Sequence, residues 1–112
     1  MKKDNLVYIK DMFGATEQIL EYCDELDYLK FVNTKMIQDA VIRNLEILGE
    51  AANKLSDDFV HDHPDLPVKQ ARGMRNLLVH QYDYVNVDEV WKVIEKDLPP
   101  LQEVLKKILN EL

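Results

Sequence analysis

Apolar residues recur every three or four positions along most of this 112-residue chain, which is the spacing of one face of an α-helix. A first stripe runs from Leu6 to Leu26 and predicts an amphipathic helix of about 25 residues. A second stripe runs from Ile37 to Leu55, and its helix can be capped by Asn33 or Thr34. The first half of the chain is therefore predicted to form two long helices.

Gly49 stands inside the second predicted helix, beside two further small residues, Ala51 and Ala52. Glycine within a helix costs about 1 kcal/mol relative to alanine, so a packing reason for its presence is expected. These small residues predict that another helix approaches closely at this point.

The second half of the chain carries a weaker pattern. Residues 56–66 show no helical period and are predicted to form a loop. A third helix is expected over residues 67–81, because Pro67 suits a first helical turn. Asn86, with Glu89 three residues later, resembles a capping box that opens a fourth helix. Pro99 and Pro100 should end or sharply break that helix, and a short amphipathic helix follows them.

These elements predict an all-α fold, an up-and-down bundle of four main helices plus a short C-terminal helix, in a single domain over residues 1–112. The chain has only 3 Gly and 4 Pro, too few for the many tight turns of a sandwich or barrel, which excludes an all-β architecture. Several apolar stripes are wide enough to serve both a core and a partner, so we expect a homodimer.

The single cysteine and the N-terminal region indicate the cellular compartment in which the protein is expected. Cys23 has no partner for an internal disulfide and falls on the first apolar stripe, so it is interpreted as a small buried hydrophobe. Charged residues interrupt the N-terminal segment before a signal sequence develops, and no stretch approaches the roughly 20 apolar residues of a membrane span. A soluble cytoplasmic protein without membrane contact is expected.

Charge limits the possible partners. The chain has 14 Lys and Arg against 21 Asp and Glu, a formal charge of −7, so most of its surface should repel nucleic acid. Any nucleic acid must therefore bind at a local positive site. Only three arginines are present, Arg43, Arg72 and Arg75, and the last two lie three residues apart.

Residues 72–84 combine those two arginines with His80, Tyr82 and Tyr84. On a helix Arg75 and His80 are about 140° apart around the axis and about 7.5 Å apart along it, so they do not share one face. Both side chains can reach one small group only if the helix unwinds near His80 or if a second copy of the chain completes the site across a two-fold axis.

The pattern Arg75-x4-His80-x-Tyr82 matches the R-x4-H-x-Y signature of the HepT-like branch of the HEPN superfamily, all-α ribonuclease toxins paired with a minimal nucleotidyltransferase antitoxin. Two longer segments are similar to that branch, RNLEILGEA at residues 43–51 and GMRNLLVH at residues 73–80. Val90-Trp91, followed by DLP at residues 97–99, is similar as well, and the resemblance covers roughly residues 5–112.

The resemblance implies the toxin component of a toxin–antitoxin pair, a metal-independent endoribonuclease that needs no cofactor and works as a homodimer with its two motifs facing each other. His80, with an ordinary pKa near 6.5, would exchange protons with the 2′-hydroxyl of RNA or with the departing 5′-oxygen. Arg75 would hold the scissile phosphate and stabilise its developing charge. Arg72, one turn earlier, could extend phosphate binding. The expected products are a 2′,3′-cyclic phosphate and a 5′-hydroxyl.

The resemblance also implies a means of control. The partner nucleotidyltransferase would transfer AMP to Tyr82, and the added nucleotide would block the cleft and occupy its phosphate site. Tyr84 is a second acceptor candidate outside the motif.

Structural readings compete with these roles. Arg75 can be a surface residue paired with an acid, His80 a helix C-cap favoured by the helix dipole, and Tyr82 a partly buried aromatic residue. Two other functions compete with the nuclease: a non-catalytic adaptor that binds the nucleotidyltransferase or a nucleotide, and a purely structural dimerisation bundle. The charge of −7 favours the adaptor, because an acidic surface repels an RNA substrate. A dimer would offset this repulsion by supplying Arg72, Arg75 and His80 twice in one cleft.

Two other clusters favour structural roles. His61 and His63 lie among acidic residues but show no recognised ligand frame, so no metal site is predicted. Arg43, Glu46 and Glu50 have the spacing of ion pairs on a helix surface. Glu46 or Glu50 could instead orient Arg75 from the neighbouring helix.

Overall fold

The computed structural model describes residues 2–75 and 86–111, with side chains from residue 5 onward, and every element in these ranges is a helix. The elements are α1 (Lys2–Tyr22), α2 (Tyr28–Val32), α3 (Lys35–Asn53), α4 (Asp57–Asp62), α5 (Val68–Gly73), α7 (Val87–Lys92), the π-helix η1 (Val93–Asp97) and α8 (Leu98–Glu111). The predicted all-α fold is confirmed.

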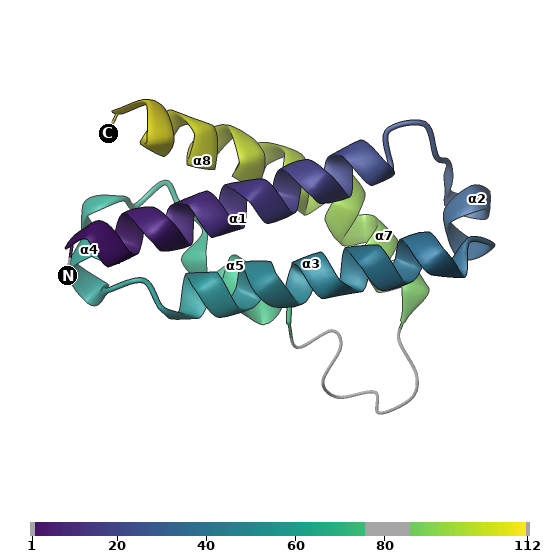
Figure 1. Ribbon diagram of the computed structural model, residues 1–112, viewed down its shortest axis with the longest axis horizontal. Helices are drawn as coiled ribbons and strands as arrows, with labels where there is room; N and C mark the ends of the chain where they lie inside the picture. The colour runs from purple at the N-terminus through teal and green to yellow at the C-terminus, as the bar shows by residue number, and fades with distance from the viewer. Residues whose placement is uncertain (1, 76–85, 112) are drawn as a thin grey trace.

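The long helices α1 and α3 run antiparallel, side by side, and form the centre of the bundle (Figure 1). Helix α8 packs along α1, and α5 packs against α3. The apolar stripes predicted from the sequence supply the core that these helices share. Its largest side chains with almost no exposed surface are Ile9, Met12 and Ile19 from α1, Phe31 from α2, Val41, Leu45 and Leu48 from α3, Val90 from α7, and Leu98, Leu101, Leu105 and Ile108 from α8.

The first helix ends four residues earlier than the stripe predicts, at Tyr22 rather than Leu26. A turn follows, and Asp27 then caps α2 by accepting a hydrogen bond from the main-chain nitrogen of Lys30 at 2.8 Å. This short helix exists because of its cap and the burial of Phe31. Cys23 is buried at the end of the first stripe, as predicted.

The prediction of a loop over residues 56–66 is wrong in part, because residues 57–62 of this segment form helix α4. Ser56 caps α4 through a bond from the main-chain nitrogen of Phe59 to its hydroxyl oxygen, 3.2 Å long. Asn5 of α1 holds Ser56 in place: its amide oxygen accepts from the Ser56 nitrogen (3.0 Å) and its amide nitrogen donates to the hydroxyl (3.1 Å). Six residues are too few to show a helical period, so the pattern could not reveal α4.

At the C-terminal end the predicted cap is confirmed, since the side-chain oxygen of Asn86 accepts from the Glu89 nitrogen at 3.1 Å. The prediction that Pro99 and Pro100 end the helix is wrong, because both lie in the first turn of α8. Neither proline has an N–H to donate to the preceding turn. The irregularity precedes them, in η1, where the Leu98 nitrogen bonds to the Val93 oxygen in the i to i−5 pattern of a π-helix.

The third helix is shorter in the described residues than predicted. Pro67 is the N-cap of α5 and Met74 its C-cap, and residues 76–81 of the predicted helix lie outside the described ranges. Among the helices that the structure describes, none has both the length and the apolar character needed to span a lipid bilayer.

Candidate functional site

Arg72 belongs to the last turn of α5, which packs against the C-terminal half of α3. Its Nε donates a hydrogen bond to the main-chain oxygen of Ala52, 3.2 Å away, and the side chain is half-buried. Carbonyl oxygens in the last turn of a helix carry partial negative charge, which favours an arginine there. This bond fixes the end of α5 on α3.

Arg75 follows in the turn after α5 and lies directly over Gly49 of α3. A Cβ atom placed on Gly49 would stand 2.9 Å from the Cβ of Arg75 and 3.2 Å from its main-chain nitrogen. Real Cβ atoms essentially never stand 2.9 Å from another atom, and 3.2 Å is already tight, so the approach requires glycine at this position. The predicted close approach at Gly49 is confirmed, and the segment that makes it carries Arg75.

The acidic residues of α3 do not pair with these arginines. Between described residues, ion pairs of 4.0 Å or less join Lys35 to Asp39, Lys92 to Glu89 and Lys107 to Asp65. The ion pairs predicted for Arg43 with Glu46 and Glu50 are not formed among them, and neither glutamate pairs with Arg75. Exposed pairs gain little over solvation in water, which explains why correct spacing does not suffice.

The other predicted site residues, His80 and Tyr82, lie outside the described residues, as does Tyr84. Of the predicted site residues, the structure therefore describes Arg75, the first residue of the R-x4-H-x-Y motif, and Arg72, which precedes the motif by three residues. It also describes the elements on either side of residues 76–85, which are α5 before them and α7 after them (Figure 1).

Helix α7 is held against α2 by an aromatic cluster. Trp91 packs against Phe31, with ring centres 5.1 Å apart, and against the edge of Tyr28 at 6.4 Å. The Tyr28 hydroxyl donates to a carboxylate oxygen of Asp88. This bond, together with some burial and the negative charge of Asp88, raises the pKa of Tyr28. The cluster fixes the element that follows the motif and explains why α7 carries a tryptophan.

The two histidines before α5, His61 and His63, lie on or next to helix α4. Nδ1 of His63 lies 2.9 Å from the main-chain oxygen of Phe59, and the two rings stack with centres 4.1 Å apart. His61 is exposed on α4. Within residues 2–75 and 86–111 no three His, Cys, Asp or Glu side chains gather in a way that could hold a metal ion.

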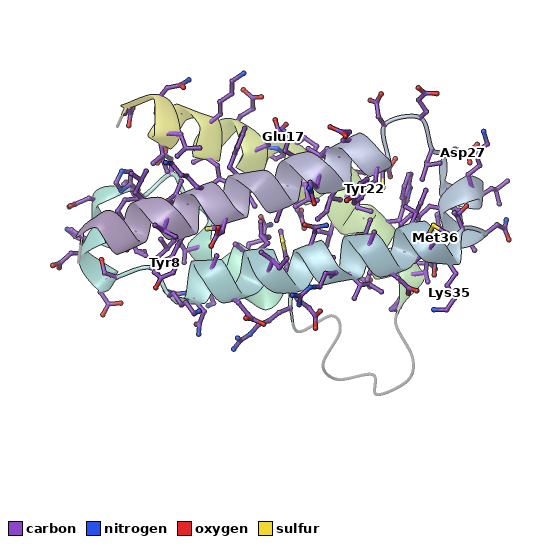
Figure 2. All side chains as sticks on the ribbon, viewed as in Figure 1. Tyr8, Glu17, Tyr22, Asp27, Lys35 and Met36 are labelled. Atoms are coloured by element: carbon purple, nitrogen blue, oxygen red, sulfur yellow. The ribbon has the colours of Figure 1, made fainter. Side chains whose placement is uncertain are left out.

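An acidic hollow of about 600 Å³ lies along the C-terminal half of α1, and sequence reasoning missed it. Its lining includes the carboxylates of Glu17, Glu21, Asp24 and Glu25, with Gln102 from α8. Glu17 and Tyr22, which belong to this lining, are labelled on α1 in Figure 2. Carboxylates repel the phosphates of a nucleic acid, so this hollow is not suited to bind RNA.

The end of the bundle formed by α2 and the start of α3 exposes apolar side chains. Leu29 is 67% exposed and Met36 is 81% exposed, with Tyr28 and Val32 nearby on α2. Figure 2 shows Met36 and Lys35 at this end, near Asp27. These exposed side chains lie between the two long apolar stripes predicted from the sequence, which end at Leu26 and resume at Ile37.

The fold and site together define an all-α domain that presents two arginines from the end of a helix docked on its central pair. The family model described as "Ribonuclease HepT-like" matches residues 12–108. The chain belongs to this ribonuclease family, which confirms the resemblance drawn from the three sequence segments.

Curated relatives match over nearly their whole length. A protein named "Probable ribonuclease HepT" from Thermococcus cleftensis is 37% identical over 108 residues, 96% of this chain and 98% of the relative. Two proteins of Methanocaldococcus jannaschii named as putative RNases are 35% and 34% identical, covering 91% and 99% of this chain and 94% and 96% of their own lengths. No significant match was found among solved structures.

Proposed function

We propose that this chain is the toxin of a toxin–antitoxin pair and cuts RNA without a metal ion, through Arg75 and His80 at a dimer cleft. The observation that carries the proposal is the docking of the two motif-region arginines on α3, in a chain that belongs to the HepT-like ribonuclease family. Arg75 is half-buried, and none of the described carboxylates neutralises it within 4.0 Å. A cation in that state is suited to a phosphate ligand.

In the proposed reaction the 2′-hydroxyl of the RNA loses its proton to His80, and the 2′-oxygen attacks the adjacent phosphorus. The bond from phosphorus to the 5′-oxygen breaks, and that oxygen receives a proton from a protonated His80. The products are a 2′,3′-cyclic phosphate and a 5′-hydroxyl. Arg75 stabilises the negative charge on the phosphate oxygens as it develops. Arg72, whose Nε is engaged by Ala52, offers its terminal nitrogens to a neighbouring phosphate.

Two copies of the chain serve this reaction better than one. The net charge of −7 and the acidic hollow on α1 repel RNA over much of the surface. A two-fold axis beside the motifs would bring Arg72, Arg75 and His80 together twice, and it would join an arginine and a histidine that one helix holds about 140° apart. Light scattering of the purified protein tests this arrangement, and a monomer that still cuts RNA would contradict it.

Control of the toxin is proposed to act on Tyr82. A nucleotidyltransferase partner would transfer AMP to its phenol oxygen, with pyrophosphate leaving from ATP. The AMP phosphate, two residues from His80, would then compete with RNA for the same cations.

A non-catalytic adaptor is the second candidate, favoured by the acidic charge of the chain. An RNA oligonucleotide with a single 2′-deoxy position distinguishes the two. If the proposed reaction is correct, the unmodified RNA yields a cyclic phosphate end and the deoxy substitution prevents cleavage at that position alone. An adaptor would leave both oligonucleotides intact.

A further inference from the structure

We propose that Gly49 of α3 is a positioning residue for Arg75, setting where the arginine side chain starts and hence where its guanidinium reaches. The inference rests on the proposed role of Arg75 in RNA cleavage. It extends that role to a residue with no functional group, which acts only through its lack of a side chain.

The contact involves parts of Arg75 that cannot move aside by themselves. A Cβ on Gly49 would lie 2.9 Å from the Cβ of Arg75, 3.2 Å from its main-chain nitrogen and 3.3 Å from its Cγ. These atoms belong to the backbone and the base of the side chain, so rotation of the outer side chain relieves nothing. One added methyl group must shift the turn that carries Arg75 away from α3.

A second contact, one helical turn away, shows that this turn is docked in a defined register. Gly49 and Ala52 are three residues apart on α3, and Arg72 and Arg75 are three residues apart after the start of α5. Arg72 Nε bonds to the Ala52 oxygen at 3.2 Å while Arg75 lies on Gly49. Between the two arginines, Met74 is buried in the core. The backbone therefore has little freedom to absorb a displacement at one point only.

The other two glycines provide an internal comparison. A Cβ on Gly14 of α1 or on Gly73 of α5 would meet no atom within 4 Å among the described residues, its chain neighbours and its own helix backbone apart. Glycine is a poor helix former, and Gly49 lies inside a 19-residue helix. Within the part of the chain that the structure describes, Gly49 is the one glycine with a neighbour that requires it, and that neighbour is Arg75.

A displacement of this kind should appear in the rate of cleavage. Misplacing a catalytic group by about 1 Å can cost roughly a hundredfold in rate. We therefore expect Gly49→Ala to lower kcat by about ten- to hundredfold, with a smaller effect on KM, because Arg75 acts chiefly on charge that develops in the transition state.

The matched control is Gly14→Ala, the same substitution in a helix with open space around it. Both variants are assayed at a temperature where circular dichroism shows each to be folded. Gly14→Ala should cleave RNA within about twofold of the wild-type rate, as is usual for a change remote from the reacting groups. If Gly49→Ala alone is too unstable, it is combined with Gly14→Ala, which strengthens α1. Equal kcat for the two single variants would overturn the inference.

A second measurement does not depend on cleavage. The chain contains three arginines, so a nitrogen–proton correlation spectrum of arginine Nε groups has three signals to assign. Gly49→Ala should move the Arg75 signal, whereas Gly14→Ala should leave it in place. An unmoved Arg75 signal in Gly49→Ala would contradict the positioning role.

The two measurements also separate this inference from the proposed function. If Arg75→Ala cuts RNA as well as the wild type, the proposed catalytic role of Arg75 fails whatever Gly49 does. If Arg75→Ala is inactive while Gly49→Ala retains full kcat and an unchanged spectrum, the positioning role alone fails.

Discussion

Arg72 donates from Nε to the main-chain oxygen of Ala52 over 3.2 Å, which joins the end of α5 to the last turn of α3. One arginine of the motif region therefore has a structural partner on the central helix. This bond gives Arg72 a stabilising role, to which the proposed function adds phosphate binding.

We predict that Arg72→Ala lowers the free energy of unfolding by about 1 to 3 kcal/mol, because a hydrogen bond from a charged donor is lost. It should also raise KM for RNA, with a smaller change in kcat. Urea unfolding and steady-state cleavage measure the two effects. Arg43→Ala is the control, since it removes the same charge from an exposed position on α3. Identical stability of the two variants would contradict the role of the bond to Ala52.

His80→Ala should reduce cleavage by about a hundred- to ten-thousandfold, the usual range for loss of a general acid or base. Arg75→Ala should reduce it by about a hundred- to thousandfold, as for loss of a group that stabilises transition-state charge, and both variants should keep the fold. A gel assay with circular dichroism of each variant checks this. The controls are Arg43→Ala and His61→Ala, which remove exposed side chains of the same types.

The same assay examines the role of metal. The proposed mechanism uses no divalent ion, so EDTA should not inhibit cleavage. Inhibition by the chelator that Mg²⁺ or Mn²⁺ reverses would contradict it.

Tyr82→Phe should remain catalytically competent but escape neutralisation, because it lacks the phenol oxygen that accepts AMP. After incubation with the partner nucleotidyltransferase and ATP, intact mass spectrometry should show added AMP on the wild type and none on this variant. Tyr84→Phe is the control and should be modified like the wild type. An adduct that maps to Tyr84 or Tyr8 would show the assignment to be wrong.

Burial raises the pKa of the Cys23 thiol from 9.0 to about 11. The unfolded chain then releases the thiol proton at a lower pH than the folded chain, so stability should fall as pH rises from about 9 towards 11. Urea unfolding at pH 8 and pH 10.5 should show a larger loss for the wild type than for Cys23→Ala, in which this group is absent. An equal loss of stability in the wild type and in Cys23→Ala would show that the Cys23 thiol does not contribute to the pH dependence of stability.

The long helices were predictable because each has many turns over which a period can appear. The stripe of α3 also made Gly49 conspicuous, although its partner Arg75 lies 26 positions away and no local pattern connects them. Short helices left no such signal. Helix α4 is capped by Ser56, and the main-chain nitrogen and hydroxyl of Ser56 are hydrogen-bonded to Asn5, which lies 51 positions earlier in the sequence.

The family was predictable, since the spacing of Arg75, His80 and Tyr82 carried the resemblance that the family match confirms; the roles of these three residues stay predictions. The structural use of Arg72 was not predictable, because a hydrogen bond to a main-chain oxygen depends on packing rather than on the identity of Ala52. Spacing also misled at Arg43, where a favourable helix-surface arrangement with Glu46 forms no ion pair.

The π-helix before Pro99 has a consequence for the length of the C-terminal region. A π-helical turn holds about one residue more than an α-helical turn, and each residue rotates an α-helix by about 100°. Deleting one residue from Val93–Asp97 would therefore let this segment form a regular α-turn, and the apolar side of α8, with Leu101 and Leu105, would still face α1. A one-residue deletion within α8 itself would instead rotate its apolar side by about 100°, so homologous chains that keep this packing should differ in length by one residue at 93–97 rather than within 98–111.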